Sequence, residues 1–303
     1  VDWLLEMGVD LTDVGKMAGS TNSRTHRPAG GAAVGSHLVQ VLENQVKNRG
    51  IDIRYNNEVT GLIDQDGKVA GVIVETPEGN YKINSKAVII ATGGFGANPE
   101  IIVSYKPELE GFGTTNHSGA TGDALEWIKV FDGDVVDMEQ IQTHPTVIPE
   151  KNIMITEAVR GNGAIMINRD GKRFGSEMAT RDVMSDAILK QKGKTAFLVF
   201  DQGVRDSLKA IESYAKQGLL TVGKDLKELA EKLKIDAGEF EKSVKKYNDA
   251  VEKGLDEEFG RKASEMPRKI EIGPFYAVEV GPAVHHTMGG IKINADTEVL
   301  NKD

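Results

Sequence analysis

The feature that most constrains the fold of this sequence is a short apolar run that ends in two glycines. Residues 86–91 (KAVIIA) carry no charge after the first position and lead directly into Thr92-Gly93-Gly94. An apolar run of this length predicts a strand that is buried on both faces, as in the centre of a parallel sheet. Glycines after such a strand allow a ligand close to the backbone at the carboxyl edge of the sheet. The same turn also occurs in purely structural roles, so the motif by itself leaves both interpretations open.

The elements before this run are typical of an α/β domain. Apolar residues recur at helical spacing over residues 35–50 and predict a helix that ends at Gly50. Asp66-Gly67 and Glu78-Gly79 are signals of hairpin turns. Strands are therefore expected at residues 51–55, 59–63, 69–75 and 81–83.

The pattern changes after about residue 138. Residues 202–254 are highly charged, with apolar residues at helical spacing, which predicts helices in a solvated outer layer. Further elements are expected as a helix at 181–190 and strands at 196–201, 275–280 and 291–293. We expect an α/β fold in which an α/β domain over residues 1–138 carries an α+β insertion over residues 139–285. Residues 286–303 would return to the first domain.

The composition excludes several classes of protein. The formal net charge of −9 argues against binding of nucleic acid, which needs a basic face. The absence of cysteine excludes disulfides, thiolate metal sites and iron–sulfur clusters in this stretch of chain. No run approaches the ~18 apolar residues of a membrane span. None of these features identifies the compartment, so the localisation stays unknown.

A loop of small polar residues is a second candidate for a ligand site. Residues 114–123 (TTNHSGATGD) precede an expected helix at residues 124–130. Such a loop could place backbone N–H groups, with Asn116, Gly122 and Asp123, against a bound cofactor. An ordinary glycine-rich loop with a helix cap has the same composition, and that interpretation is favoured for the loop taken alone.

Histidine and arginine gather in three separated segments. His144 precedes Pro145, and His285-His286 precedes Thr287-Met288-Gly289-Gly290. A metal site is a weak interpretation, because no HxH or HExxH spacing is present. Residues 156–182 are rich in arginine, glycine and threonine. Surface ion pairs are the usual fate of such residues, but arginine is also the preferred side chain for bidentate recognition of a carboxylate.

These segments together carry a resemblance to a known family. The motifs HP at 144–145, TEAVRGNGA at 156–164, TRD at 180–182 and VHHTMGG at 284–290 resemble soluble fumarate reductases of the flavocytochrome c type. The similarity runs end to end and includes THRPAGG at 25–31 and ATGGFG at 91–96. The resemblance implies a partial FAD-binding, Rossmann-like domain over residues 1–138 and 286–303. It implies that residues 139–285 are the clamp, or capping, domain that closes over the flavin.

The resemblance also implies roles for individual residues. Arg181 matches the acid that protonates the substrate, and Glu157 and Arg160 match the relay that reprotonates it. Substrate contacts are implied at His144, Thr156, His285, Met17 and Met154. The resemblance implies cofactor contacts at Val59 and His286. Together with the residues of the glycine turn after residue 91 and of the loop at 114–123, the candidates for cofactor contacts are Val59, Ala91, Thr92, Gly93, Asn116, Gly122, Asp123 and His286.

The implied reaction is the reduction of an unsaturated dicarboxylate, fumarate to succinate. Hydride would come from N5 of FAD and the proton from Arg181. Electrons would come from a haem or flavin module or protein upstream. The alternatives are a sister enzyme that acts on urocanate or an acrylate-type acid, and a domain that kept the fold without the chemistry. The presence of both His144 and Thr156 favours a substrate with a second carboxylate.

Two features of the family have no counterpart in the sequence. The Gly-x-Gly-x-x-Gly fingerprint for the FAD pyrophosphate and the second substrate arginine near the C-terminus are both missing. The sequence starts at Val1 rather than at a methionine and stops at Asp303. We expect it to be cut from a longer protein, and we expect the fragment alone to bind FAD poorly and to have little activity.

Overall fold

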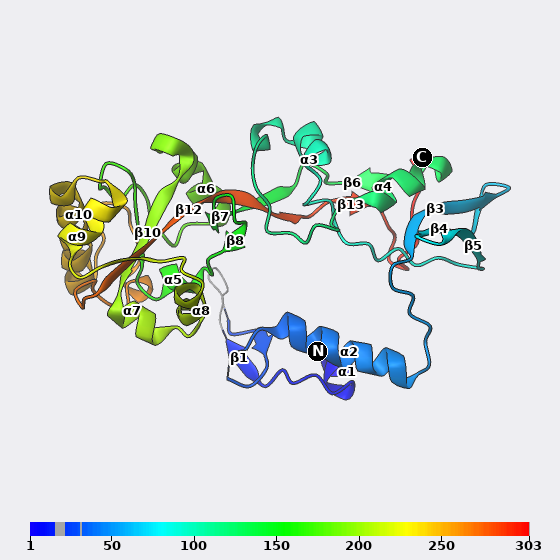
Figure 1. Ribbon diagram of the computed structural model, residues 1–303, viewed down its shortest axis with the longest axis horizontal. Coiled ribbons are helices and arrows are strands. Elements are labelled where there is room, and N and C mark those ends of the chain that lie inside the picture. Colours follow the sequence, from blue (N-terminus) through cyan, green and yellow to red (C-terminus); the bar gives the residue numbers. More distant parts are fainter. Residues whose placement is uncertain (16–21, 31, 303) are drawn as a thin grey trace. The chain divides into compact units, whose positions relative to one another are not determined.

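A computed structural model describes residues 1–15, 22–30 and 32–302 (Figure 1). Contacts between residues divide the chain into two compact units. The first contains residues 1–59 and 74–81, and the second contains residues 60–73 and 82–303.

The first unit contains the expected long helix. Its elements are α1 (Asp2–Glu6), β1 (Asp13–Gly15), β2 (Thr25–Arg27) and α2 (Val34–Asn48), and β1 pairs with β2 in antiparallel register. The helix expected over residues 35–50 is confirmed as α2, and Gly50 after it has a positive φ of 64°. The strand expected at residues 51–55 is wrong. These residues form no ladder, and Ile51 and Tyr55 are exposed, because apolar alternation makes a strand only where a partner supplies hydrogen bonds.

The expected β-meander is confirmed. β3 (Glu58–Gln65), β4 (Lys68–Thr76) and β5 (Gly79–Asn84) form a three-stranded sheet in that order. The turn between β3 and β4 places Asp66 at φ 56° and Gly67 at φ 76°. A two-residue hairpin turn of type I′ has a positive φ at both positions, which explains the Asp-Gly pair.

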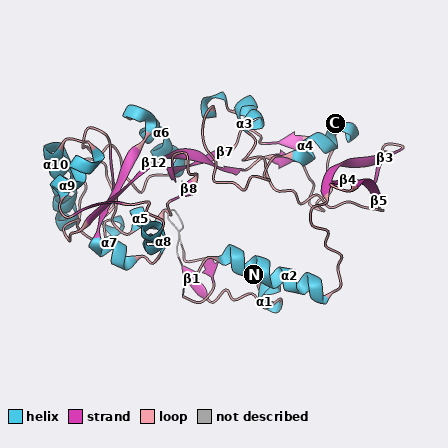
Figure 2. Ribbon diagram, in the orientation of Figure 1, coloured by secondary structure: helices cyan, strands magenta, loops and turns pink. Residues whose placement is uncertain are grey.

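The second unit is built on a six-stranded antiparallel sheet with the order β8-β7-β12-β10-β9, and β11 also pairs with β12. Its strands are β7 (Ile141–Ile148), β8 (Ile153–Met154), β9 (Ile165–Ile167), β10 (Ala196–Asp201), β11 (Thr221–Gly223) and β12 (Phe275–Thr287). β12 is the longest strand, and Figure 2 shows it running through this region. The strands expected at 196–201 and 275–280 are confirmed, and β12 extends the second of them to residue 287.

Helices cover both faces of this sheet, because its strands alternate two sets of apolar side chains. Phe197 and Val199 of β10 face the core under α9 and α10, whereas Leu198 and Phe200 face the core under the other helices. The helices are α5 (Ala158–Gly161), α6 (Arg181–Leu189), α7 (Gln202–Ser207), α8 (Ala210–Lys216), α9 (Leu226–Leu233) and α10 (Ala237–Lys253). The helices expected at 181–190 and within 202–254 are confirmed, and the charged faces of α9 and α10 are exposed.

Aspartates begin the two charge-rich helices. The Asp225 carboxylate accepts from the Glu228 N–H at 2.8 Å before α9, and Asp236 does the same for Glu239 at 2.8 Å before α10. Such N-caps satisfy backbone donors that the first helical turn leaves free. Helix α10 ends at Gly254, which takes a positive φ of 65°.

A third apolar cluster holds the segments near the expected cofactor loops. Phe95, Ile102, Met138 and Val284 are among its buried residues. The remaining elements are α3 (Pro99–Tyr105), η1 (Pro107–Leu109), α4 (Asp123–Trp127), η2 (Ile128–Phe131), β6 (Val135–Val136), η3 (Lys192–Lys194), η4 (Ala263–Glu265) and β13 (Gly290–Ile291). The strand expected at 291–293 is shorter than predicted and pairs with β6. The α/β class is confirmed.

The central strand expected at residues 86–91 is wrong. These residues have no strand assignment and pair with no other described segment, and Ile89 is 92% exposed. The apolar composition predicts burial, but none of these residues is buried in the structure. A strand, however, also needs a neighbouring backbone to complete its hydrogen bonds, and the described residues provide none here.

Candidate active site

Pairing between β7 and β12 brings two of the predicted histidines together. Ala283 lies opposite His144 and Val284 opposite Thr143 in the antiparallel register. The rings of His144 and His285 are 5.1 Å apart between centroids and meet edge to face. The ring of His286 lies 3.9 Å from that of His285, on the exposed side. Residues far apart in the sequence therefore form one cluster.

Both paired histidines are neutral near pH 7. Burial, together with the neighbouring guanidinium of Arg181, lowers the pKa of His144 to about 3. Burial, the His286 ring and Arg181 lower the pKa of His285 to about 4. Burial and Arg181 also lower the pKa of His286. A neutral imidazole carries one N–H donor and one acceptor, so each ring can donate a hydrogen bond without carrying a charge.

A chain of charged side chains lies beside the histidines. Arg181, the first residue of α6, donates to the Glu157 carboxylate at 3.4 Å, and Arg160 donates to the other oxygen of that carboxylate at 3.2 Å. Arg181 also donates to the Gln142 side chain of β7 at 2.8 Å. The three residues predicted as acid and relay are therefore in hydrogen-bond contact, with Glu157 between the two arginines.

Arg160 is the buried end of this chain. Its guanidinium is fully buried and donates to the Glu177 carbonyl at 2.6 Å, and its Nε finds no partner among the residues the structure describes. Burial lowers the pKa of Arg160, and the nearby positive charge of Arg181 acts in the same direction while Glu157 opposes it. The cationic form of Arg160 is thus less favoured than that of an exposed arginine.

A second, buried ion network contacts Arg160 through Glu177 and Arg261. The buried Glu177 carboxylate accepts two hydrogen bonds from Arg173, both at 2.8 Å, and one from Arg261 at 3.1 Å. Arg261 also donates to the Arg160 carbonyl at 2.7 Å, and Arg173 reaches Asp256 at 3.0 Å. Sequence reasoning missed these residues. The only available signal was the four-residue spacing of Arg173 and Glu177, which is common on any helix surface.

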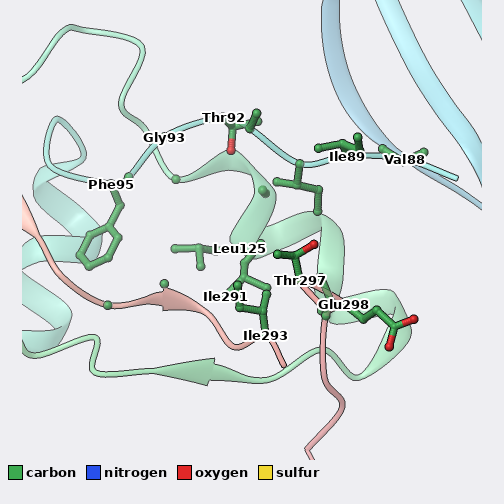
Figure 3. Close-up of a pocket in the computed structure, with 18 of the residues that line it drawn as sticks. Val88, Ile89, Thr92, Gly93, Phe95, Leu125, Ile291, Ile293, Thr297 and Glu298 are labelled. Carbon is green, nitrogen blue, oxygen red and sulfur yellow. The ribbon is translucent and has the colours of Figure 1, made fainter. Parts of the chain in front are cut away.

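A cavity of about 650 Å³ is lined by four of the eight predicted cofactor contacts. Ala91, Thr92, Gly93 and Gly122 all line it. Figure 3 shows Thr92 and Phe95 on one stretch of chain, with Leu125, Ile291 and Ile293 also facing the cavity. Gly93 has a positive φ of 77°, and nothing lies within 4 Å of where its Cβ would be. The backbone at this position is therefore open to a ligand, which is one of the two interpretations of the glycines after residue 91.

Asn116 and Asp123 make local contacts. The Asn116 amide donates to the Thr114 hydroxyl at 2.9 Å and to the His285 carbonyl at 3.1 Å, and Asp123 accepts from the Thr121 hydroxyl at 2.8 Å. Their expected contact with a cofactor stays a prediction.

The other predicted contacts are more scattered. Thr156 immediately precedes Glu157, and its N–H donates to the Tyr214 hydroxyl at 3.0 Å. Met154 is in β8 and is 38% exposed. Met17 lies outside the described residues. Val59 belongs to the first unit, so its contact with the adenine side stays a prediction.

The described residues contain neither a candidate metal site nor a candidate membrane-spanning helix. Within 1–15, 22–30 and 32–302, no group of three or more His, Asp or Glu side chains is arranged to hold a metal ion. No helix in the same ranges is both long enough and apolar enough to cross a membrane.

Comparisons with known proteins match the whole chain. Residues 1–303 match the family model described as FAD binding domain. The chain is 46% identical over 303 residues to "Fumarate reductase (cytochrome)" of Shewanella frigidimarina, covering 99% of this chain and 53% of that protein. It is 42% identical over 304 residues to "NADH:fumarate oxidoreductase" of Klebsiella pneumoniae (strain 342), covering 100% of this chain and 33% of that protein.

A solved structure agrees with these sequence matches. The open conformation of a flavocytochrome c3 fumarate reductase superposes with a TM-score of 0.85 at 39% identity, covering 99% of this chain and 53% of that one. The chain thus spans about half the length of the Shewanella relative and about a third of the Klebsiella one.

Proposed function

Because the chain belongs to the FAD binding domain family, we propose that its protein uses FAD to reduce the C=C bond of an unsaturated dicarboxylate, fumarate being the preferred substrate. The similar proteins named for fumarate reduction support this choice. The observation that carries it is the contact chain Arg181–Glu157–Arg160 beside two neutral histidines. Such a site combines a proton donor with uncharged donors for carboxylates.

The cavity fits the cofactor. It is within the usual size range of ligand sites, and two of its glycines, Gly93 and Gly290, have open space where a Cβ would be. Ala91–Gly93 and Gly122 would hold FAD, and His286 would touch the flavin where β12 leads toward the glycines of the cavity wall. Bound reduced FAD supplies the hydride for the reaction.

The histidines supply the carboxylate grip in this proposal. The backbone N–H of Thr146 donates to Nδ1 of His144 at 3.3 Å, so this nitrogen is an acceptor and Nε2 carries the proton. His144 with Thr156 would hold one carboxylate, and His285 the other. Met17 and Met154 would lie near the double bond. Neutral donors that withdraw charge from a carboxylate stabilise the negative charge that develops on the substrate carbon.

Proton transfer uses the charged chain. Arg181 gives a proton from its guanidinium to the substrate carbon, and Glu157, in contact with it, returns one. Arg160 contacts the other oxygen of Glu157 and completes the relay. An arginine is a weak acid, since its ordinary pKa is above ~12. A second guanidinium held nearby on the same carboxylate disfavours the doubly charged site and makes the transfer from Arg181 easier.

The clamp and the electron donor complete the proposal. Residues 139–285 would form a clamp that excludes water from the site and aligns the reacting atoms. The six-stranded sheet with helices on both faces supports the proposal that the clamp moves as one rigid domain. A haem or flavin donor would deliver the electrons to the bound cofactor.

A substrate panel tests the proposed function. The full-length protein with FAD bound, supplied with a low-potential electron donor, is assayed with fumarate, urocanate, methacrylate and crotonate. We expect the highest kcat/KM with fumarate, because only fumarate offers two carboxylates at short separation to the two histidines. A higher kcat/KM with urocanate or a monocarboxylate, or no turnover with any of the four, would overturn the proposal.

The role of Arg181 has a matched control in the same chain. Arg205 has a similar exposure, 25% against 24% for Arg181, and also pairs with a glutamate. We expect Arg181→Lys to lower kcat for fumarate by at least about a thousandfold, since general acid catalysis contributes about 10²–10⁴-fold and the geometry is also lost. Arg205→Lys should leave kcat within about twofold. Near wild-type turnover in Arg181→Lys would remove Arg181 from the mechanism.

A further inference from the structure

The loop before α4 runs beside the histidine pair of β12. The Thr115 N–H donates to the Val284 carbonyl at 2.9 Å, and the Val284 N–H donates to the Gly113 carbonyl at 2.9 Å. Thr114 and Val284 form a parallel bridge, and the Asn116 amide donates to the His285 carbonyl at 3.1 Å. The backbone on both sides of Thr115 is therefore fixed against His285.

The Thr115 hydroxyl is placed on one nitrogen of His285. Its Oγ1 lies 2.7 Å from Nδ1, while the next acceptor, the Val284 carbonyl, is 3.4 Å away. That carbonyl already accepts the shorter bond from the Thr115 N–H. The hydroxyl hydrogen is therefore better placed on Nδ1 than on the carbonyl. Among the described residues, Nε2 of His285 has no hydrogen-bond partner.

We propose that Thr115 is a positioning residue that donates its hydroxyl hydrogen to Nδ1 of His285 and so keeps the proton on Nε2, where it is presented to an anionic carboxylate. The carboxylate part of this inference rests on the proposed function. With the other tautomer, Nε2 would carry a lone pair toward the anion, and the two would repel. Thr115 thus decides whether His285 attracts or repels the substrate.

The comparison with His144 explains why a side chain is needed here. At His144 a backbone N–H, that of Thr146, occupies Nδ1, and no substitution of a side chain removes it. The Thr146 hydroxyl is bonded to the Ile155 carbonyl at 2.8 Å. At His285 the same function falls to a hydroxyl. The tautomer of His285 therefore depends on one side chain, and that of His144 does not.

The first test reads the tautomer directly and needs no substrate. Histidine labelled with ¹⁵N is measured by NMR at pH 7 in the FAD-loaded wild type, in Thr115→Ser and in Thr115→Val. The protein has six histidines, and His285→Gln assigns the signal. We expect a protonated Nε2 and an unprotonated Nδ1 in the wild type and in Thr115→Ser, and a shift toward protonated Nδ1 in Thr115→Val. A wild type with protonated Nδ1, or a Thr115→Val variant with the wild-type spectrum, would overturn the inference.

The second test concerns the carboxylate. We expect Thr115→Val to raise KM for fumarate about tenfold with a smaller change in kcat, and Thr115→Ser to restore it, because a lost hydrogen-bond donor to a charged group has an effect of this order. An unchanged KM in Thr115→Val, in a variant whose NMR spectrum has changed, would show that His285 does not hold the substrate. If the wild type itself failed to turn over fumarate, the proposed function would fall, whereas the tautomer result would stand independently.

Discussion

The charged half and the neutral half of the candidate site are stabilised in different ways. Arg160, Glu157 and Arg181 form a row of alternating charge whose buried end continues into Glu177 and its arginine partners. His144 and His285 carry no charge and are held by single neutral hydrogen bonds from Thr146 and Thr115. The two halves meet where Arg181 lowers the pKa of both histidines.

The difference shows how one small site can keep two kinds of donor. The positive charge of Arg181 favours the neutral form of both imidazoles, so His144 and His285 are uncharged donors near pH 7. The charged half needs buried partners to be tolerated at all, because each unpaired charge in the interior is costly. We therefore expect substitutions in the charged half to cost much more stability than those in the neutral half.

The largest effect is expected at Glu177. Glu177→Gln removes the negative charge that Arg173 and Arg261 share in the interior, so two arginines lose their common partner. We expect the free energy of unfolding to fall by about 3–5 kcal/mol, measured by urea denaturation. Glu228→Gln on α9, which removes a surface pair with Lys232, should leave it unchanged within error. A change of less than about 1 kcal/mol at Glu177 would mean that this network is not a main support of the charged half.

The next effect is a dependence of stability on pH that comes from His144. Its pKa is about 3 in the folded protein and about 6.5 when unfolded, so between these values only the unfolded chain binds the proton. Its contribution is fully present above about pH 6.5 and is lost as the pH falls toward 3. Between pH 7 and pH 5 we expect the wild type to lose about 2 kcal/mol more than His144→Asn, which keeps an acceptor for the Thr146 N–H but does not titrate.

Denaturation curves at several pH values measure this difference. Above about pH 7.5 the two proteins should show parallel pH dependence, since His144 is neutral in both states there. Parallel curves down to pH 5 would mean that His144 is accessible to protons in the folded protein, and the neutral half would lose its defining property.

The smallest effect is expected at Thr146. Thr146→Val removes the buried hydrogen bond to the Ile155 carbonyl and keeps the shape of the side chain. We expect the free energy of unfolding to fall by about 1 kcal/mol, as for a neutral hydrogen bond. Thr12→Val, which removes an exposed hydrogen bond of 2.7 Å to Asp10, serves as the control and should have no measurable effect. A loss at Thr146 as large as that at Glu177 would contradict the comparison between the halves.

Elements that depend on a local sequence pattern were predicted better than elements that depend on long-range contacts. The spacing of Leu229 and Leu233, and of Phe240 and Val244, identified the buried faces of α9 and α10, because a helix makes its own hydrogen bonds and needs only one apolar face. Residues 86–91 failed for the opposite reason. Their composition indicates burial, but a strand takes its hydrogen bonds from another segment, which the sequence does not name.

The same limit applies to the site. Glu157 and Arg160 are three residues apart, a spacing that brings side chains together within a helical turn, so their contact was predictable. The contact between Glu177 and Arg261 joins distant segments, and nothing in the motif around either residue indicates the other. Thr115 was likewise inside a loop whose favoured interpretation was structural. Its importance appears only once β12 places His285 beside it.

The position of β12 in the chain has a consequence for folding. β7 and β10, which pair with it, come much earlier in the sequence. Forming these ladders therefore requires closing long loops, and the entropy cost of closure comes before the stabilisation from the strand pairing. During synthesis residues 275–287 emerge last, after the other five strands of the six-stranded sheet. We therefore expect the two histidines to meet late in folding, so that a half-made chain displays the arginines well before it has a finished site.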